Sequence, residues 1–258
     1  MIRRPGPLRY QIPWYLISCL AAGCARSASV SVTMPLMPPI PRVRVSGFPS
    51  PTSPILLAEP FDTLDYGRWR DVGVEGYTTY EAATLDGRAC LKAHSQGTAS
   101  ILLTETRFDP DTYEWLAWDW RVDRLVEGED LNAKAGSDAA ARVYVYFDTI
   151  GLPWQKHSLD YVWSATLPVG TVLSSTYADN AKMFVVESGT EHLGTWQHVE
   201  RNIRDDYMQA FGTTRIPRAV AVGLMTDTDN TKTESLAYFD SVIVSRKPGA
   251  VLPETFKK

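Results

Sequence analysis

Apolar and polar side chains alternate along much of residues 55–246, and this period of two limits the possible folds more than any other feature of the sequence. In residues 118–122 the two Trp and the Val occupy one set of positions, and Asp119 and Arg121 occupy the other. Residues 142–148 repeat the pattern, with Val and Phe set against Arg and Tyr. Successive side chains of an extended chain point to opposite faces of a sheet, so the pattern predicts half-buried β-strands.

About ten segments suit strands, and polar or glycine-containing turns separate them. The expected strands are residues 76–83, 88–93, 100–104, 118–122, 142–148, 160–163, 183–187, 196–203, 219–225 and 236–244. Only residues 205–212 suit a helix, with Asp205 as the N-cap and Gly212 at the end. Short strands without intervening helices predict an all-β fold, an antiparallel two-sheet β-sandwich. A jelly-roll-like arrangement is the first choice and a more open sandwich is the alternative.

The first 23 residues are expected to be a signal peptide rather than part of the fold. Positive side chains precede the apolar run of residues 12–22, which is too short to span about 30 Å of hydrocarbon. Small residues then lead to Cys24, an arrangement that resembles the bacterial lipoprotein signal, in which a peptidase cuts before a lipid-modified cysteine. The resemblance implies lipidation of Cys24 and, because Ala25 follows it, sorting to an outer membrane. An ordinary secretory signal and an uncleaved anchor are the alternatives.

Two further stretches lie outside the expected domain, which is residues 55–246. Residues 24–54 are rich in Pro and Ser, and proline removes backbone donors and favours an extended chain. We expect this stretch to be a tether that holds the domain away from a membrane surface. Residues 247–258 are expected to be a loose tail. The predicted location is the cell envelope, as an outer-membrane lipoprotein or in the periplasm.

The charge balance and the absence of known motifs exclude several classes of function. The formal net charge is −4 and no basic stripe is present, so a nucleic-acid partner is not expected. The sequence contains no G-x-S-x-G elbow, H-E-x-x-H pair, P-loop or G-x-G-x-x-G loop. Its three cysteines do not make a disulfide framework. No complete catalytic signature is therefore present.

One group of charged residues is a candidate ligand-binding site. The group consists of Asp138, Arg142, Arg201, Asp205 and Asp206. Arg142 follows Asp138 by four residues and shares a strand face with Tyr144 and Tyr146. The guanidinium group presents a planar fork that suits carboxylates, including those of acidic sugars. A structural Arg–Asp brace within the sandwich and a catalytic role for the acids are the alternatives.

Two pairs of aromatic residues share strand faces. Tyr161 and Trp163 form one pair, and Trp118 and Trp120 form the other. An exposed pair at i and i+2 provides a platform on which sugar rings stack, whereas inward-facing aromatics are the usual core of a sandwich. The core interpretation is preferred for Trp118 and Trp120. Both interpretations stay open for Tyr161 and Trp163, which are included among the ligand-binding candidates.

Asp227, Asp229 and Asn230 provide closely spaced oxygens of the kind that Ca²⁺ prefers. They do not begin an EF-hand loop, because Lys232 stands where the sharp-turn Gly belongs and Tyr238 where the bidentate Glu belongs. A calcium site of another type is one interpretation. The other is a polar hairpin loop whose side chains bond their own backbone.

Four segments resemble a bacterial family known as domain of unknown function 3047. They are residues 137–147, 161–164, 194–196 with 201–207, and 225–231. The resemblance covers roughly residues 61–244, and Ser137 stands where the family pattern would have a second Asp beside Asp138. It implies an exported β-sandwich similar in shape to sugar-binding jelly-roll modules, and it implies no particular activity.

The same resemblance suggests a second calcium hypothesis by analogy. Many sugar-binding jelly rolls hold a structural calcium ion between their first and last strands. Here Glu59 and Asp62 open the domain, and Asp240 lies in its last expected strand. The alternative is that these acids pair with nearby Arg residues or face water.

The leading hypothesis is a non-catalytic, envelope-associated module that binds a glycan or another envelope polymer. The first alternative is a hydrolase or lyase that acts on polysaccharide. It would use acids from Asp138, Asp205 and Asp206, with Arg142 or Arg201 holding an acidic sugar. The second alternative is a structural envelope component that binds another protein.

Overall fold

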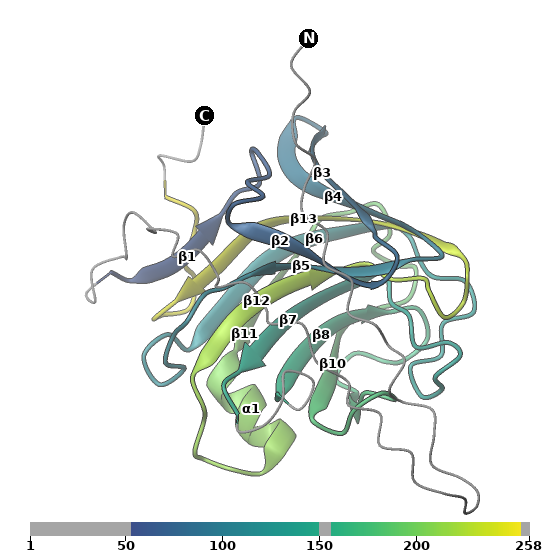
Figure 1. Ribbon diagram of the computed structural model, residues 1–258. Coiled ribbons are helices and arrows are strands. Elements are labelled where there is room, and N and C mark those ends of the chain that lie inside the picture. The colour runs from purple at the N-terminus through teal and green to yellow at the C-terminus, as the bar shows by residue number, and fades with distance from the viewer. Residues whose placement is uncertain (1–52, 150–155, 254–258) are drawn as a thin grey trace, which may run out of the picture.

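A computed structural model describes residues 53–149 and 156–253 (Figure 1). The predicted signal peptide, Cys24 and nearly all of the predicted tether lie outside the described residues, as does the end of the predicted tail. No helix within the described part of the chain is long and apolar enough to cross a membrane.

The described chain forms two β-sheets that pack face to face (Figure 1). The seven-stranded sheet has the order β2 (Trp69–Glu75), β5 (Ala99–Thr104), β12 (Ala219–Met225), β7 (Ala141–Phe147), β8 (Ser158–Ser164), β10 (Ala181–Ser188), β9 (Val172–Ser174). The six-stranded sheet has the order β11 (Gln197–Asn202), β6 (Trp115–Arg124), β13 (Glu234–Ser245), β4 (Arg88–Gln96), β3 (Thr79–Leu85), and β1 (Ile55–Glu59) also pairs with β13. These pairs are antiparallel except for β8 and β10, which are parallel. The predicted all-β, jelly-roll-like sandwich is therefore confirmed.

Three strands were not predicted from the sequence: β1, β2 and β9. β2 and β9 lie at the two edges of the seven-stranded sheet, and β1 pairs only with the second half of β13. A strand at an edge depends on the pairing that its neighbour offers, so its own sequence needs little strand pattern. This explains why alternation alone did not reveal them.

β13 is the last strand in the sequence, yet it lies inside the six-stranded sheet. Its first half pairs with β4 and its second half pairs with β1, while its other edge pairs with β6 along nearly its whole length. The sheet is therefore complete only when residues from both ends of the domain come together.

One helix, α1 (Ile203–Phe211), lies at one end of the sandwich (Figure 1). Its N-cap is Asn202, whose side-chain oxygen accepts a hydrogen bond from the Asp205 backbone N–H at 3.0 Å. The sequence-based choice of Asp205 as the cap was therefore wrong by three residues. The predicted end is confirmed, because Gly212 adopts the left-handed conformation with φ 64°.

The core lies between the two sheets and is rich in aromatic rings. Trp118 and Trp120 of β6 point inward, and they meet Tyr161 and Trp163 of β8 from the facing sheet. The ring centroids are 5.2 Å apart for Trp118 and Tyr161 and 5.9 Å apart for Trp120 and Trp163. All four rings have 0% exposure, so this inter-sheet stack is the centre of the core.

Candidate functional site on the outer face of the seven-stranded sheet

The alternation of β7 fixes which of its side chains leave the core. Val143, Val145 and Phe147 are fully buried in the main core. Arg142, Tyr144 and Tyr146 therefore point to the outer face of the sheet, as the sequence pattern predicted.

The outer face carries an apolar and aromatic patch made by β2, β5, β7 and β12. We call it the aromatic patch; its members are Ala99, Tyr144, Met225, Val74, Ile101 and Tyr146. The Tyr144 and Tyr146 rings are stacked, with centroids 5.5 Å apart and an angle of 11° between their planes. Val74, Ile101 and Tyr146 remain partly exposed. An outer sheet face is usually polar, so such a patch marks a surface suited to contact with another molecule.

Gly223 of β12 leaves a space without a side chain next to this patch. It pairs with Leu103 on one side and with Tyr144 on the other. A Cβ atom added at Gly223 would lie 2.9 Å from a side-chain carbon of Ile101. The glycine thus lets the patch side chains pack closely across the strand.

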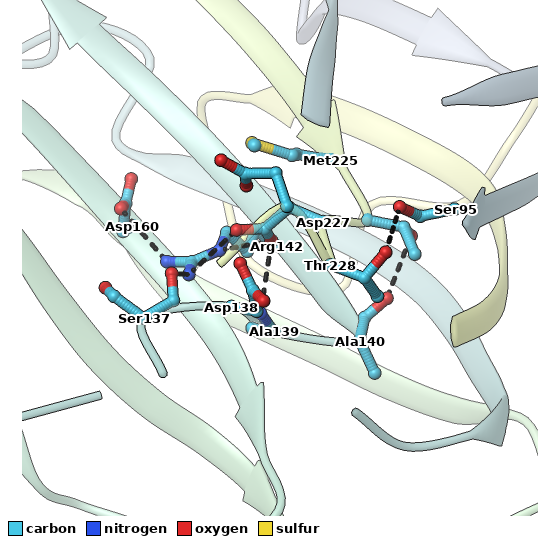
Figure 2. Close-up of polar contacts among 12 residues, drawn as sticks. Ser95, Ser137, Asp138, Ala139, Ala140, Arg142, Asp160, Met225, Asp227 and Thr228 are labelled. Carbon is cyan, nitrogen blue, oxygen red and sulfur yellow. Dashed lines mark hydrogen bonds and ion pairs between the residues drawn. The ribbon is translucent and has the colours of Figure 1, made fainter. Parts of the chain in front are cut away.

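A buried ion pair lies beside the aromatic patch (Figure 2). Arg142 Nε donates to Asp227 Oδ1 at 2.8 Å, and Arg142 Nη2 donates to Asp227 Oδ2 at 3.3 Å. Arg142 Nη2 also donates to the carbonyl oxygen of Ser137 at 3.0 Å, and Arg142 Nη1 lies 3.4 Å from the sulfur of Met183. Arg142 and Asp227 are 4% and 3% exposed. The pair joins β7 to the chain that follows β12.

The segment that carries Asp227 is itself tied down by hydroxyl groups. Thr226 Oγ1 donates to the Ala140 carbonyl at 2.8 Å, and the hydroxyls of Thr228 and Ser95 are hydrogen-bonded at 2.7 Å (Figure 2). Asp227 Oδ1 also accepts a bond from the Ala139 N–H at 3.1 Å. These bonds hold the Asp227 carboxylate in place before any ligand arrives.

Asp160 lies on the opposite side of Arg142 from Asp227 (Figure 2). Its Oδ2 is 3.8 Å from Arg142 Nη1, its Oδ1 has no hydrogen-bond partner among the described residues, and its exposure is 3%. Burial, outweighing the attraction of Arg142 and helped by the repulsion of Asp227, raises the pKa of Asp160 to about 8. Arg142 does not reverse this shift because its hydrogen bonds go to Asp227. Asp160 is therefore a largely protonated acid at neutral pH.

Asp138 has a structural role in the loop next to this site. Its Oδ1 accepts bonds from the backbone N–H and side-chain amide of Asn230, at 3.1 and 2.8 Å. Its Oδ2 accepts bonds from the N–H and hydroxyl of Thr231, at 2.7 and 2.8 Å. Asp138 thus fixes the 229–231 turn and leaves no oxygen directed at a ligand.

The predicted calcium residues Asp227, Asp229 and Asn230 do lie close together. Oxygens of Asp138, Asp227 and Asp229 come within 4.8 Å of one another. However, both Asp138 oxygens and both Asp227 oxygens already accept bonds from N–H or O–H groups, and the Asn230 side-chain oxygen accepts a bond from Tyr177. Each accepted bond occupies one of the two lone pairs of its oxygen, so these bonds compete with a cation, and a calcium site here stays a prediction.

The three acids of the second calcium hypothesis do not gather into a cation cluster among the described residues. Glu59 Oε2 accepts a bond from Trp69 Nε1 at 2.9 Å, and Asp62 is exposed. Asp240 instead binds Arg88 Nε at 2.5 Å on the outer face of the six-stranded sheet. Arg88 also pairs with Asp119 and lies 4.2 Å above the Trp196 ring. An Arg–Asp brace, which was the alternative, accounts for Asp240.

The predicted charged cluster divides into two separate sites. Arg201 Nε donates to Asp206 Oδ2 at 2.9 Å, and the Tyr161 hydroxyl donates to the same oxygen at 2.9 Å. Because Tyr161 points into the core while Arg142 points outward, Arg201 and Asp206 lie on the other side of the seven-stranded sheet from Arg142. Asp205 is exposed. The acids considered for hydrolysis therefore do not converge on one site.

Tyr161 and Trp163 do not form a surface platform. Both rings have 0% exposure within the inter-sheet stack, and Trp163 Nε1 donates to the Gly189 carbonyl at 3.2 Å. The core interpretation accounts for them. Tyr144 and Tyr146 of β7, in contrast, do lie on the outer face.

Asp160 was not among the sequence-based candidates, although the sequence contains a signal for it. It immediately precedes Tyr161 and alternates with it and Trp163, so an inward Tyr161 forces Asp160 onto the outer face. Its cross-strand partner is Tyr144. Strand pairing, which sequence alone does not give, places it next to Arg142.

The raised pKa of Asp160 predicts a specific pH dependence of stability. The folded state holds this proton up to about pH 8, whereas an unfolded Asp loses it near pH ~4. Its stabilising contribution is thus complete below about pH 4 and is lost as the pH rises through about 8. Asp160→Asn removes this titration. We expect the free energy of unfolding of the Asp160→Asn variant, relative to that of the natural chain, to rise by about 1–3 kcal/mol between pH 5 and pH 9. Urea unfolding at each pH measures this difference. Parallel stability profiles for the two chains would contradict this.

The fold and this site define a class: a β-sandwich module with an aromatic patch and a buried Arg–Asp network on one sheet face. The chain belongs to the family described as Protein of unknown function (DUF3047), whose family model matches residues 67–243. The resemblance seen in the sequence is thereby confirmed. No curated protein matches the chain.

Several solved structures are similar in architecture. "Cellulose induced protein, Cip1" shares 11% identity, with 75% of this chain and 99% of that chain covered and a TM-score of 0.47. The xyloglucanase domain of NopAA from Sinorhizobium fredii shares 10% identity, with 71% and 96% covered and a TM-score of 0.44. The family 30 carbohydrate-binding module of cellulase Cel9D-Cel44B of Clostridium thermocellum shares 10% identity, with 75% and 100% covered and a TM-score of 0.39. These likenesses are too distant to assign an activity.

Proposed function

We propose that this protein is a non-catalytic glycan-binding module whose ligand lies on the outer face of the seven-stranded sheet. The observation that carries the proposal is the aromatic patch, with the partly exposed Tyr146 stacked on Tyr144, directly beside the buried Arg142–Asp160 network. A sugar ring has an apolar face that stacks on an aromatic ring and hydroxyls that bond to polar groups. The aromatic patch offers the stacking contact, and the buried network beside it holds β7 and the chain after β12 in place.

A preorganised network supports binding rather than catalysis. Asp138 and Asp227 are fixed by hydrogen bonds from the backbone and from Arg142, so neither is free to act as a base or nucleophile. Rigid polar groups beside a stacking surface lower the entropy cost of holding a ligand. A stacking surface on a rigid support is sufficient for a binding module.

Tyr146→Ala tests the proposed surface. We expect the variant to bind polysaccharide at least tenfold more weakly than the natural chain in affinity electrophoresis, because the stacking surface is lost, a change worth about 1.4 kcal/mol. Trp196→Ala is the matched control, since Trp196 is an aromatic residue near the outer face of the other sheet. Equal binding by the natural chain and the Tyr146 variant would exclude this face.

The proposed location is the cell envelope, with the module held by a lipid on Cys24. The positive start, the short apolar run and the cysteine that follows support this proposal. Metabolic labelling with a fatty acid, followed by membrane fractionation, tests it. We expect label on the natural chain and none on Cys24→Ser. Recovery of the full chain in the cytosol with residues 1–23 intact would contradict it.

A further inference from the structure

Arg142 was expected to hold an acidic sugar, but its hydrogen-bonding groups are already engaged. Nε and Nη2 face the Asp227 carboxylate, Nη2 also bonds the Ser137 carbonyl, and Nη1 lies between Met183 and Asp160. A ligand carboxylate would need the same planar fork for a bidentate pair. It would have to displace Asp227, which would leave that buried acid without its cation.

The charges around this face are predominantly negative. Five acids lie at or near the guanidinium: Glu129, Asp138, Asp160, Asp227 and Asp229. Two further described cations lie at the margins, Arg70, which pairs with Glu105, and Lys134, whose Nζ is 5.1 Å from the Tyr177 ring centroid. With Glu105 counted as the sixth acid, and with Arg142, Arg70 and Lys134 as the cations, six acids face three cations. Burial also raises the pKa of Asp229 to about 7, so with Asp160 and Asp229 both protonated four acids still face three cations, and a polyanion is repelled.

The groups that remain suit an uncharged ligand. Asp160 Oδ1 has no hydrogen-bond partner among the described residues, but it is closed off from solvent, and the whole residue is only 3% exposed. The surface that a ligand can contact is therefore the aromatic patch rather than the Asp160 carboxyl. The partly exposed members of the aromatic patch, Val74, Ile101 and Tyr146, offer apolar contact next to it. An apolar, partly aromatic surface among predominantly negative charges suits the ring face of an uncharged sugar.

We infer that the ligand of this face is an uncharged glycan and that acidic polysaccharides are excluded from it. The inference rests on the proposed function, since it names the ligand class of the same surface. It reverses the earlier expectation that Arg142 holds an acidic sugar, because the Asp227 carboxylate already occupies the Arg142 guanidinium.

The test offers each of several polysaccharide backbones in a neutral and a carboxylated form to the full chain. Suitable pairs are hydroxyethyl and carboxymethyl cellulose, methyl-esterified pectin and polygalacturonate, and plain and glucuronic acid-substituted xylan. We expect binding to at least one neutral form, at least tenfold weaker binding to its carboxylated partner, and loss of binding in Tyr146→Ala. Binding to the neutral form should change less than twofold between 50 and 500 mM salt.

Two kinds of failure can be told apart. If a carboxylated form binds as well as its neutral partner and Tyr146→Ala abolishes that binding, the inference is overturned and the proposed function stands. A cationic glycan such as chitosan that binds more tightly than every neutral polymer would overturn it in the same way. If no polymer of any charge binds, the proposed function itself fails. Asp229→Asn adds a second readout at pH 9, above the pKa of about 7 to which burial raises the Asp229 carboxyl, because weaker repulsion should then strengthen binding of the carboxylated form and leave the neutral form unchanged.

Discussion

Arg142→Met is expected to lower the free energy of unfolding by about 3–5 kcal/mol, because it leaves the buried Asp227 carboxylate without its partner. Methionine keeps much of the length and apolar volume of the side chain, so the loss reports charge and hydrogen bonding rather than a cavity. Urea unfolding at neutral pH, followed by tryptophan fluorescence, measures the change.

Two comparisons separate a buried pair from a surface one. Arg70 also pairs with an acid, Glu105, but both side chains are more than half exposed. Arg70→Met should therefore cost no more than about 1 kcal/mol. The double variant Arg142→Met with Asp227→Leu should recover part of the loss, since no buried charge is then unpaired. Equal effects at Arg142 and Arg70 would show that burial does not set the strength of the Arg142 pair.

Trp163→Ala is expected to cost about 3–5 kcal/mol of stability, because it removes a fully buried ring that packs 5.9 Å from Trp120 across the two sheets. The indole N–H bond to the Gly189 carbonyl is lost as well. Thermal and urea unfolding measure the effect, and Trp163→Phe should retain much of the packing and cost clearly less.

The Trp163→Phe variant also tests whether Trp163 belongs to the core or to a ligand platform. If Trp163 belongs only to the core, Trp163→Phe should fold and bind polysaccharide like the natural chain. If that variant is as stable as the natural chain but has lost binding, Trp163 contacts the ligand and the core interpretation is wrong.

Alternation in the sequence predicted the sandwich and the face to which Arg142 points. In β7 every second residue, Val143, Val145 and Phe147, is apolar, and this is enough to send Arg142 and Tyr144 outward. The periodicity reports which residues share a face, and it holds because packing between the sheets needs one apolar face on each strand.

The same pattern does not tell which partner a side chain meets. Asp227 is 85 residues from Arg142 in the sequence, and their ion pair depends on the order β12–β7–β8 in the sheet. Asp240 was assigned to a metal site for the same reason, because the position of Arg88 over β13 follows from sheet order rather than from local sequence. Long-range pairing, rather than local propensity, is what sequence reasoning lacked.

The position of β13 affects how this chain can fold as it is made. Residues 234–245 supply the strand that joins β6 to β4 and β1, so a nascent chain cannot complete that sheet until this strand has emerged. Contacts between residues so far apart in sequence form slowly. The six-stranded sheet should therefore stay incomplete until residues 234–245 have been synthesised.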